Sequence, residues 1–115
     1  MLIAGIILML AGVLVVAVSE AAARGRLGVN SMAGIRTYAV MKSEEAWTAG
    51  HMAARLPVGA AGLVMFLAGA ATAILPLDGN VTSVLVLATS ALAVLLVIVG
   101  AVVANRAANR TLGHA

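Results

Sequence analysis

The chain has 115 residues, of which 63% are hydrophobic and 10% are charged, whereas soluble globular chains carry about 25% charged residues. A chain this short exposes a large share of its surface, so a soluble fold has no way to bury so much apolar material. Composition therefore excludes an ordinary soluble domain and predicts an all-α membrane protein. In such a protein we interpret the basic residues behind the net charge of +3 as signals of membrane topology, and we expect no nucleic-acid partner.

The first apolar segment covers residues 2–18 and predicts a transmembrane helix. At 1.5 Å per residue it measures about 25 Å, at the short end for a hydrocarbon core of about 30 Å. A cleaved signal peptide is the rival interpretation, because small residues follow the segment. No Lys or Arg precedes the apolar run, however, and a signal peptide needs a positive start. We therefore expect a retained helix.

The second predicted span covers residues 58–77 and begins just after Pro57, a residue well tolerated at the start of a helix. Gly62 and Gly69 are seven residues apart and so lie near one face. Small residues let helices approach closely in lipid, where apolar contact alone does not drive association. This pattern indicates helix packing rather than a ligand site.

The third predicted span covers residues 84–104. A tight turn precedes it at residues 76–80, where Pro and Asp-Gly are typical turn residues. Gly100 and Ala104 form a pair of small residues for helix packing. The basic tail that follows is predicted to be frayed.

The distribution of basic residues predicts the topology. Five of them lie in the connection 20–57 and two in the tail, whereas the turn between the second and third spans carries only Asp78. The positive-inside rule then places the N-terminus outside and the connection and the C-terminus in the cytoplasm of a bacterial cell. No ionisable residue lies inside a predicted span, which argues against a transporter or an intramembrane enzyme.

The second half of the connection predicts a short interfacial helix over residues 44–56. Ser43 is a good N-cap, and acidic residues in the first turn suit the positive end of the helix dipole. Trp47 and His51 share one side of this helix, with Trp47 expected at the lipid headgroups. An adjoining polar stripe, which we expect to be solvated, consists of Glu44, Thr48, His51 and Arg55.

The first half of the connection, from residue 28 to Thr37, has no helical period and predicts an ordered loop folded against the membrane face. Arg36 in this loop has two candidate roles. It is suited to pair with Glu44 or Glu45, or to grip a phosphate or carboxylate with its planar fork.

These residues carry a resemblance. The set made of Asn30, Gly34-Ile-Arg-Thr37, Ser43-Glu-Glu45, and then Trp47 and His51 four residues apart resembles the signature of the SdpI family of small bacterial membrane proteins. The resemblance implies a helical membrane protein with a binding role. The family's namesake is a longer immunity protein that protects a cell from a secreted peptide toxin and sequesters a transcriptional repressor at the membrane.

Three functions remain open from the sequence. The first is a non-enzymatic binding or protective protein that recognises a peptide or another membrane protein. The second is an accessory subunit of a larger membrane complex, and the chain also suits a homo-oligomer. The third, an enzyme using His51 with a Glu, lacks a nucleophile and a three-ligand metal site, so we expect neither catalysis nor a cofactor. The predicted interaction or structural residues are Asn30, Gly34, Arg36, Thr37, Glu44, Trp47 and His51.

Overall fold

The computed structural model describes residues 2–30 and 32–112, and these form helices with no strand. The α-helices are α1 (Leu2–Ala23), α2 (Glu44–Ala53), α3 (Arg55–Ile74) and α4 (Gly79–Leu112), and a short 3-10 helix covers Val40–Lys42. Three of them, α1, α3 and α4, are long and apolar enough to cross a membrane. The predicted all-α fold with three spanning helices is confirmed.

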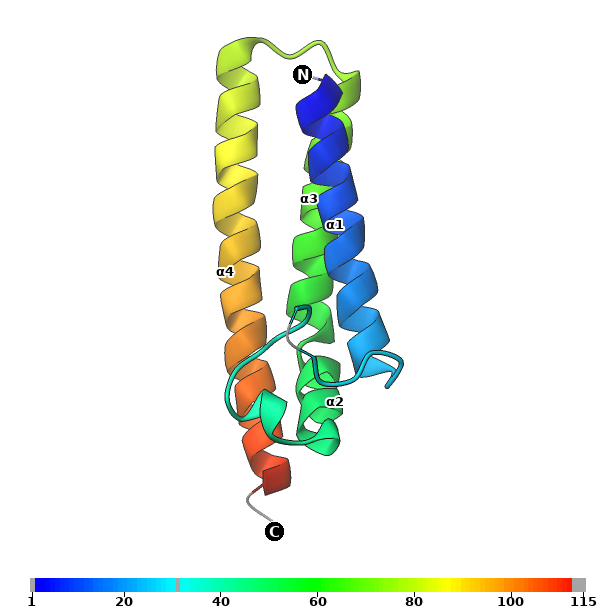
Figure 1. Cartoon of the computed structure of the whole chain (residues 1–115). Coiled ribbons are helices and arrows are strands. Elements are labelled where there is room, and N and C mark those ends of the chain that lie inside the picture. Colours follow the sequence, from blue (N-terminus) through cyan, green and yellow to red (C-terminus); the bar gives the residue numbers. More distant parts are fainter. Residues whose placement is uncertain (1, 31, 113–115) are drawn as a thin grey trace.

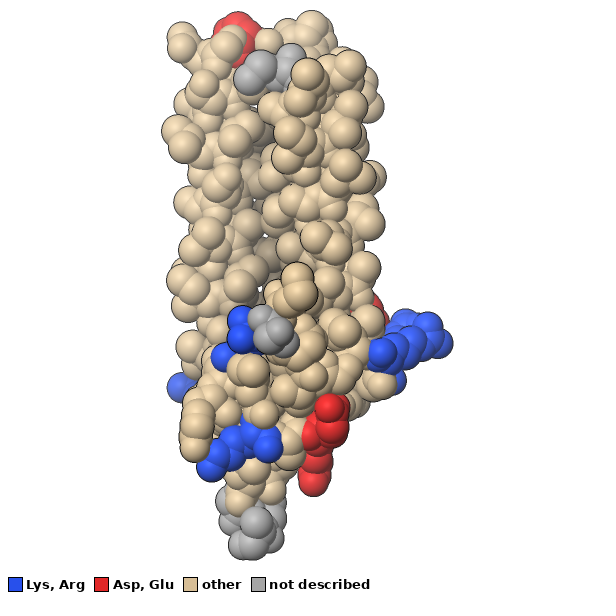
Figure 2. Space-filling view, viewed as in Figure 1, with Lys and Arg blue, Asp and Glu red and all other residues tan. Residues whose placement is uncertain are grey.

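The three long helices stand side by side in a bundle with extents of 56 × 22 × 20 Å (Figure 1). The start of α1 and the turn between α3 and α4 lie at one end. The connection between α1 and α3 lies at the other end with the end of α4. We call residues 24–54, Ser31 excepted, the connecting segment. Charged side chains gather around it, and one acidic patch marks the opposite end (Figure 2).

The contact between α1 and α3 is built on glycine. A Cβ added to Gly12 would lie 2.5 Å from the carbonyl oxygen of Gly62, and one added to Gly5 would lie 2.5 Å from that of Gly69. The two helices therefore touch through their backbones, which is the close approach that small residues permit in lipid. The predicted packing role of Gly62 and Gly69 is confirmed, and Gly5 and Gly12 are their partners.

The helices extend beyond the predicted spans at the end that holds the connecting segment. The α1 helix continues to Ala23 and so includes Glu20, and α3 begins at Arg55, before Pro57. The expected frayed tail is wrong for residues 105–112: α4 remains helical to Leu112, because Ala104 and Ala108 are fully buried in the core of the connecting segment. The rest of the predicted tail lies outside the described residues. With 34 residues, α4 is about 51 Å long and reaches past a bilayer core of about 30 Å.

The break between α2 and α3 falls at Ala54. Pro57 has no N–H to donate to the carbonyl of Ala53, and its ring crowds that carbonyl, so one continuous helix is not formed here. The helix predicted over residues 44–56 therefore ends at Ala53. Its predicted N-cap is confirmed: Ser43 Oγ accepts a hydrogen bond from the Ala46 N–H at 3.0 Å.

We predict that Gly62→Ala destabilises the bundle while Gly59→Ala does not. The added methyl group at residue 62 meets Val16 and the Gly12 carbonyl, and such overpacking costs about 1–3 kcal/mol. A Cβ at residue 59 has nothing within 4 Å, and alanine favours a helix over glycine by about 1 kcal/mol. Thermal unfolding of the two variants in detergent measures the difference. Equal melting temperatures would contradict the backbone contact.

Candidate functional site

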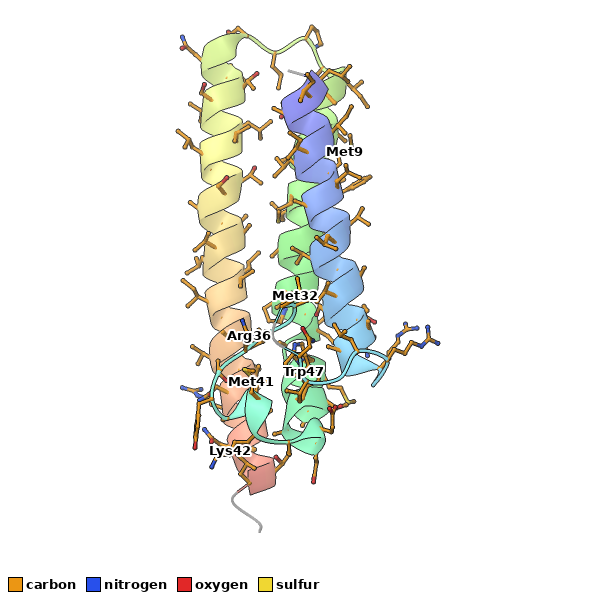
Figure 3. The ribbon with its side chains drawn as sticks, in the orientation of Figure 1. Met9, Met32, Arg36, Met41, Lys42 and Trp47 are labelled. Atoms are coloured by element: carbon orange, nitrogen blue, oxygen red, sulfur yellow. The ribbon has the colours of Figure 1, made fainter. Side chains whose placement is uncertain are left out.

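The connecting segment is organised around one aromatic pair. Trp47 and His51 lie one turn apart on α2, with ring centroids 4.4 Å apart and planes tilted by 41°. Both side chains are buried, with exposed fractions of 0% and 1%. The indole Nε1 of Trp47 donates to the Leu27 carbonyl at 2.8 Å, which connects the loop after α1 to α2. Figure 3 shows Trp47 on α2 beneath this loop.

His51 joins the irregular loop to the helix through both ring nitrogens. The backbone N–H of Ile35 donates to Nε2 at 2.8 Å, and Nδ1 lies 2.8 Å from the Trp47 carbonyl oxygen. Because Nε2 accepts, it carries no proton; because a carbonyl only accepts, Nδ1 must donate. The geometry therefore selects the neutral Nδ1–H tautomer. Burial lowers the pKa of His51, although its bond to the Trp47 carbonyl acts in the opposite direction.

Gly34 allows the loop to reach this pair. Its φ of +101° is a conformation that side chains with a Cβ rarely adopt. A Cβ at this position would also lie 2.9 Å from both His51 Nε2 and the Trp47 ring. Only glycine fits here, and the next residue, Ile35, then presents its N–H to the imidazole.

Asn30 folds the preceding turn with four hydrogen bonds from one side chain. Its Nδ2 donates to the carbonyls of Gly28 and Ala33, and its Oδ1 accepts from the N–H groups of Met32 and Ala33. An asparagine amide supplies both donors and acceptors, which aspartate does not at neutral pH. The residue thus determines the shape of the loop that carries Gly34.

Two further signature residues hold the ends of the loop. Glu44 Oε1 accepts from the Val29 N–H at 3.2 Å, which connects the first turn of α2 to the loop. Thr37 Oγ1 accepts from the Val40 N–H at 3.3 Å and so begins the 3-10 helix. Six of the seven predicted residues make hydrogen bonds or close contacts that hold the connecting segment, and we call them its network: Asn30, Gly34, Thr37, Glu44, Trp47 and His51.

Arg36 stands apart from this network. Its side chain is exposed and lies on the loop between Met32 and α4 (Figure 3). Across the described residues, the ion pairs are those of Glu20 with Arg24 and Arg55, so the pair expected between Arg36 and Glu44 or Glu45 is not formed.

Two other expectations are wrong. Trp47 does not sit at the lipid headgroups, because Leu27, Val29 and Ile35 of the loop, together with α4, cover the side of α2 that it occupies. The solvated polar stripe is not formed either: His51 is buried, and Arg55 turns toward α1 instead. A helical wheel gives the direction of a side chain but not what packs against it.

The sequence interpretation missed the contact between Glu20 and Arg55. The guanidinium donates through Nε to Oε1 at 2.8 Å and through a second nitrogen to Oε2 at 2.9 Å. This forked pair aligns the end of α1 with the start of α3. Both side chains are partly exposed, so solvent and salt screen the pair and it adds little to stability. No spacing signal reveals a pair separated by 35 residues.

Comparison with known proteins tests the resemblance seen in the signature. A model of the SdpI/YfhL protein family matches residues 26–104. The chain belongs to this family. The match to the SdpI/YfhL family covers nearly all of the connecting segment, α3 and most of α4, and it leaves α1 outside. No curated protein and no solved structure matches the chain.

The network around His51 is suited to holding a fold rather than to performing a reaction. Both imidazole nitrogens are occupied by backbone groups, so neither is available to take or give a proton. Within the described ranges, no group of three His, Cys, Asp or Glu side chains is arranged to hold a metal ion.

We predict that Gly34→Ala weakens the connecting segment more than Gly25→Ala. Both glycines have positive φ, so each alanine carries a backbone cost of about 1–2 kcal/mol. Only at residue 34 does the new methyl group also strike Trp47 and His51, because residue 25 has nothing within 4 Å. Unfolding followed by the fluorescence of Trp47, the single tryptophan, measures both variants. A Gly25 variant as unstable as the Gly34 variant would show that contact with the aromatic pair is unimportant.

Proposed function

We propose that this chain is a non-enzymatic binding protein of the bacterial cytoplasmic membrane, with a protective or signalling role. The observation that carries the proposal is the contrast among its signature residues. Six of them hold the connecting segment in one shape, whereas Arg36 lies exposed on the surface of that shape. Because the loop is already ordered, binding a partner through Arg36 would cost little loop entropy.

The partner that suits this surface is a peptide or a membrane protein with an acidic or carboxylate group. The planar guanidinium binds such groups with two parallel hydrogen bonds. Around Arg36 the loop also exposes apolar side chains, with Met32 91% exposed and Tyr38 80% exposed. An exposed arginine beside apolar groups is the composition of a small interaction surface.

The proposed orientation has the start of α1 outside and the connecting segment and the C-terminus in the cytoplasm. Arg24, Arg26, Arg36, Lys42 and Arg55 belong to the connection, and Arg106 and Arg110 to the end of α4. The opposite end carries Asp78 alone among charged residues. The side of a membrane protein that carries an excess of basic residues usually faces the cytoplasm.

A second candidate is an accessory subunit of a larger membrane complex. A shallow apolar groove of about 440 Å³ runs along the outside of the α1–α3 pair and includes Gly59. A Cβ added to Gly59 would have nothing within 4 Å. An open glycine on a lipid-facing surface allows another helix to approach closely. The same groove suits a second copy of this chain.

The protective function predicts a defined phenotype. Cells lacking the protein should become sensitive to a secreted membrane-active peptide. A plasmid copy should restore resistance, and the Arg36→Ala copy should not. Arg106→Ala is the matched control, because it removes an exposed arginine from α4 and leaves the connecting segment intact. The measurement is the inhibitory concentration across a panel of such peptides, with membrane levels of each variant compared.

Two outcomes would redirect this proposal. Unchanged sensitivity across the panel would remove the protective role. Recovery of a larger complex at fixed stoichiometry after purification in mild detergent would favour the accessory subunit, and Gly59→Leu should then release the complex while Arg36→Ala should not.

A further inference from the structure

The packing of the helices leaves a groove between α1 and α4. Both helices pack against α3, and in the described part of the chain their backbones stay farther apart, with no Cα pair of α1 and α4 within 8 Å. A furrow is visible between α4 and the α1–α3 pair in Figure 2. Exposed apolar residues line its edges, including Leu14 on α1 and Val97 on α4. In a membrane this groove opens to the acyl chains.

The groove deepens into a pocket where it meets the connecting segment. This pocket has a volume of about 320 Å³, and it is lined by α1, α3, α4 and loop residues 32–35. Gly34 and His51 form its end. An apolar cavity of about 150 Å³ is enough to stay dry and take up a small hydrocarbon, so this larger pocket suits an apolar chain rather than one trapped water.

One polar atom in the pocket has no partner. Ser19 is 5% exposed and lines the pocket, and its Oγ makes no hydrogen bond within the described residues. The nitrogens of His51 are both occupied, so His51 does not satisfy it. A buried hydroxyl without a partner is unfavourable. An occupant with an acceptor, such as an ester carbonyl, would receive this hydrogen bond.

A positive charge lies beside the pocket. Arg36 is outside the pocket lining, but it directly follows Ile35, and its side chain lies exposed between Met32 and α4 (Figure 3). Met32 and Ile35 both line the pocket. Of the four acidic residues, Glu20 is paired with Arg24 and Arg55, and Asp78 lies at the opposite end. Glu44 accepts from Val29, and neither it nor Glu45 in the same turn of α2 forms an ion pair with Arg36 in the described part of the chain. A phosphate is the group that an exposed arginine at a membrane surface recognises well.

We propose that this pocket binds an anionic phospholipid. One acyl chain lies in the groove between α1 and α4, the Ser19 hydroxyl donates to an ester carbonyl, and Arg36 binds the phosphate. The lipid site shares Arg36 with the proposed function but does not rest on it, because lipid binding requires no peptide or protein partner.

The single tryptophan provides a direct test. Trp47 is buried against Gly34 and His51, which line the pocket, so a brominated acyl chain in the pocket should quench its fluorescence. The full-length protein is placed in nanodiscs of phosphatidylcholine with a small fraction of brominated phosphatidylglycerol or brominated phosphatidylcholine. We expect half-maximal quenching at a fraction of brominated phosphatidylglycerol about fivefold lower than that of brominated phosphatidylcholine. This ratio corresponds to the attraction of one basic residue to anionic lipid at the membrane surface. Arg36→Gln should remove this preference, and Arg110→Gln should keep it.

A second pair of variants tests the groove itself. Val97→Phe fills the pocket from α4 and should reduce quenching by both lipids, whereas Val94→Phe, one turn away and outside the pocket lining, should not. Equal quenching by the two lipids in the unaltered protein would overturn the anionic site, whether or not the variants fold. If the two phenylalanine variants reduced quenching equally, binding of the acyl chain in this groove would be contradicted. Quenching that falls as protein concentration rises would instead assign the groove to a second copy of the chain.

Discussion

The imidazole of His51 holds the polar part of this molecule together. One nitrogen accepts from the backbone of the loop, and the other donates to the helix that carries it. The contact joins residues 16 positions apart, and the bond is partly buried. Breaking it would leave the Ile35 N–H and the Nε2 atom of the buried His51 without partners, which is unfavourable. The position of Arg36 depends on this contact, because Arg36 directly follows the residue that makes it.

The helices provide a rigid base for that contact. Backbone-to-backbone packing at Gly12 and Gly62 brings α1 and α3 together, and the long α4 helix supports both the membrane part and the connecting segment. Gly50 on α2 faces the Ala104 carbonyl, where an added Cβ would lie at 3.1 Å. Small residues therefore allow close helix approach both in the spans and in the connecting segment. The arrangement leaves α1 and α4 apart, and the pocket with Ser19 results from that separation.

The sequence was sufficient to predict the spans, since apolar length depends on local composition. It also predicted the Ser43 cap and the small-residue face of α3, because both are local patterns. It did not predict the burial of Trp47 or the tautomer of His51, because these depend on an irregular loop 16 to 20 residues away whose shape has no period. The Glu20–Arg55 pair and the helical end of α4 were missed for the same reason: both depend on contacts between distant segments. The family signature identified the residues of the network, and only the structure separated Arg36 from the rest.

The state of the His51 ring tests this account most directly. Two-bond proton–nitrogen correlation spectra of the labelled protein, compared with those of His51→Gln to assign the signals, report which nitrogen carries the proton. We predict a neutral ring at pH 7 with a protonated Nδ1 and a bare Nε2, and an Ile35 amide proton that exchanges slowly with solvent. A ring protonated at Nε2, or an Ile35 amide that exchanges as fast as an exposed one, would contradict the central role given to this contact.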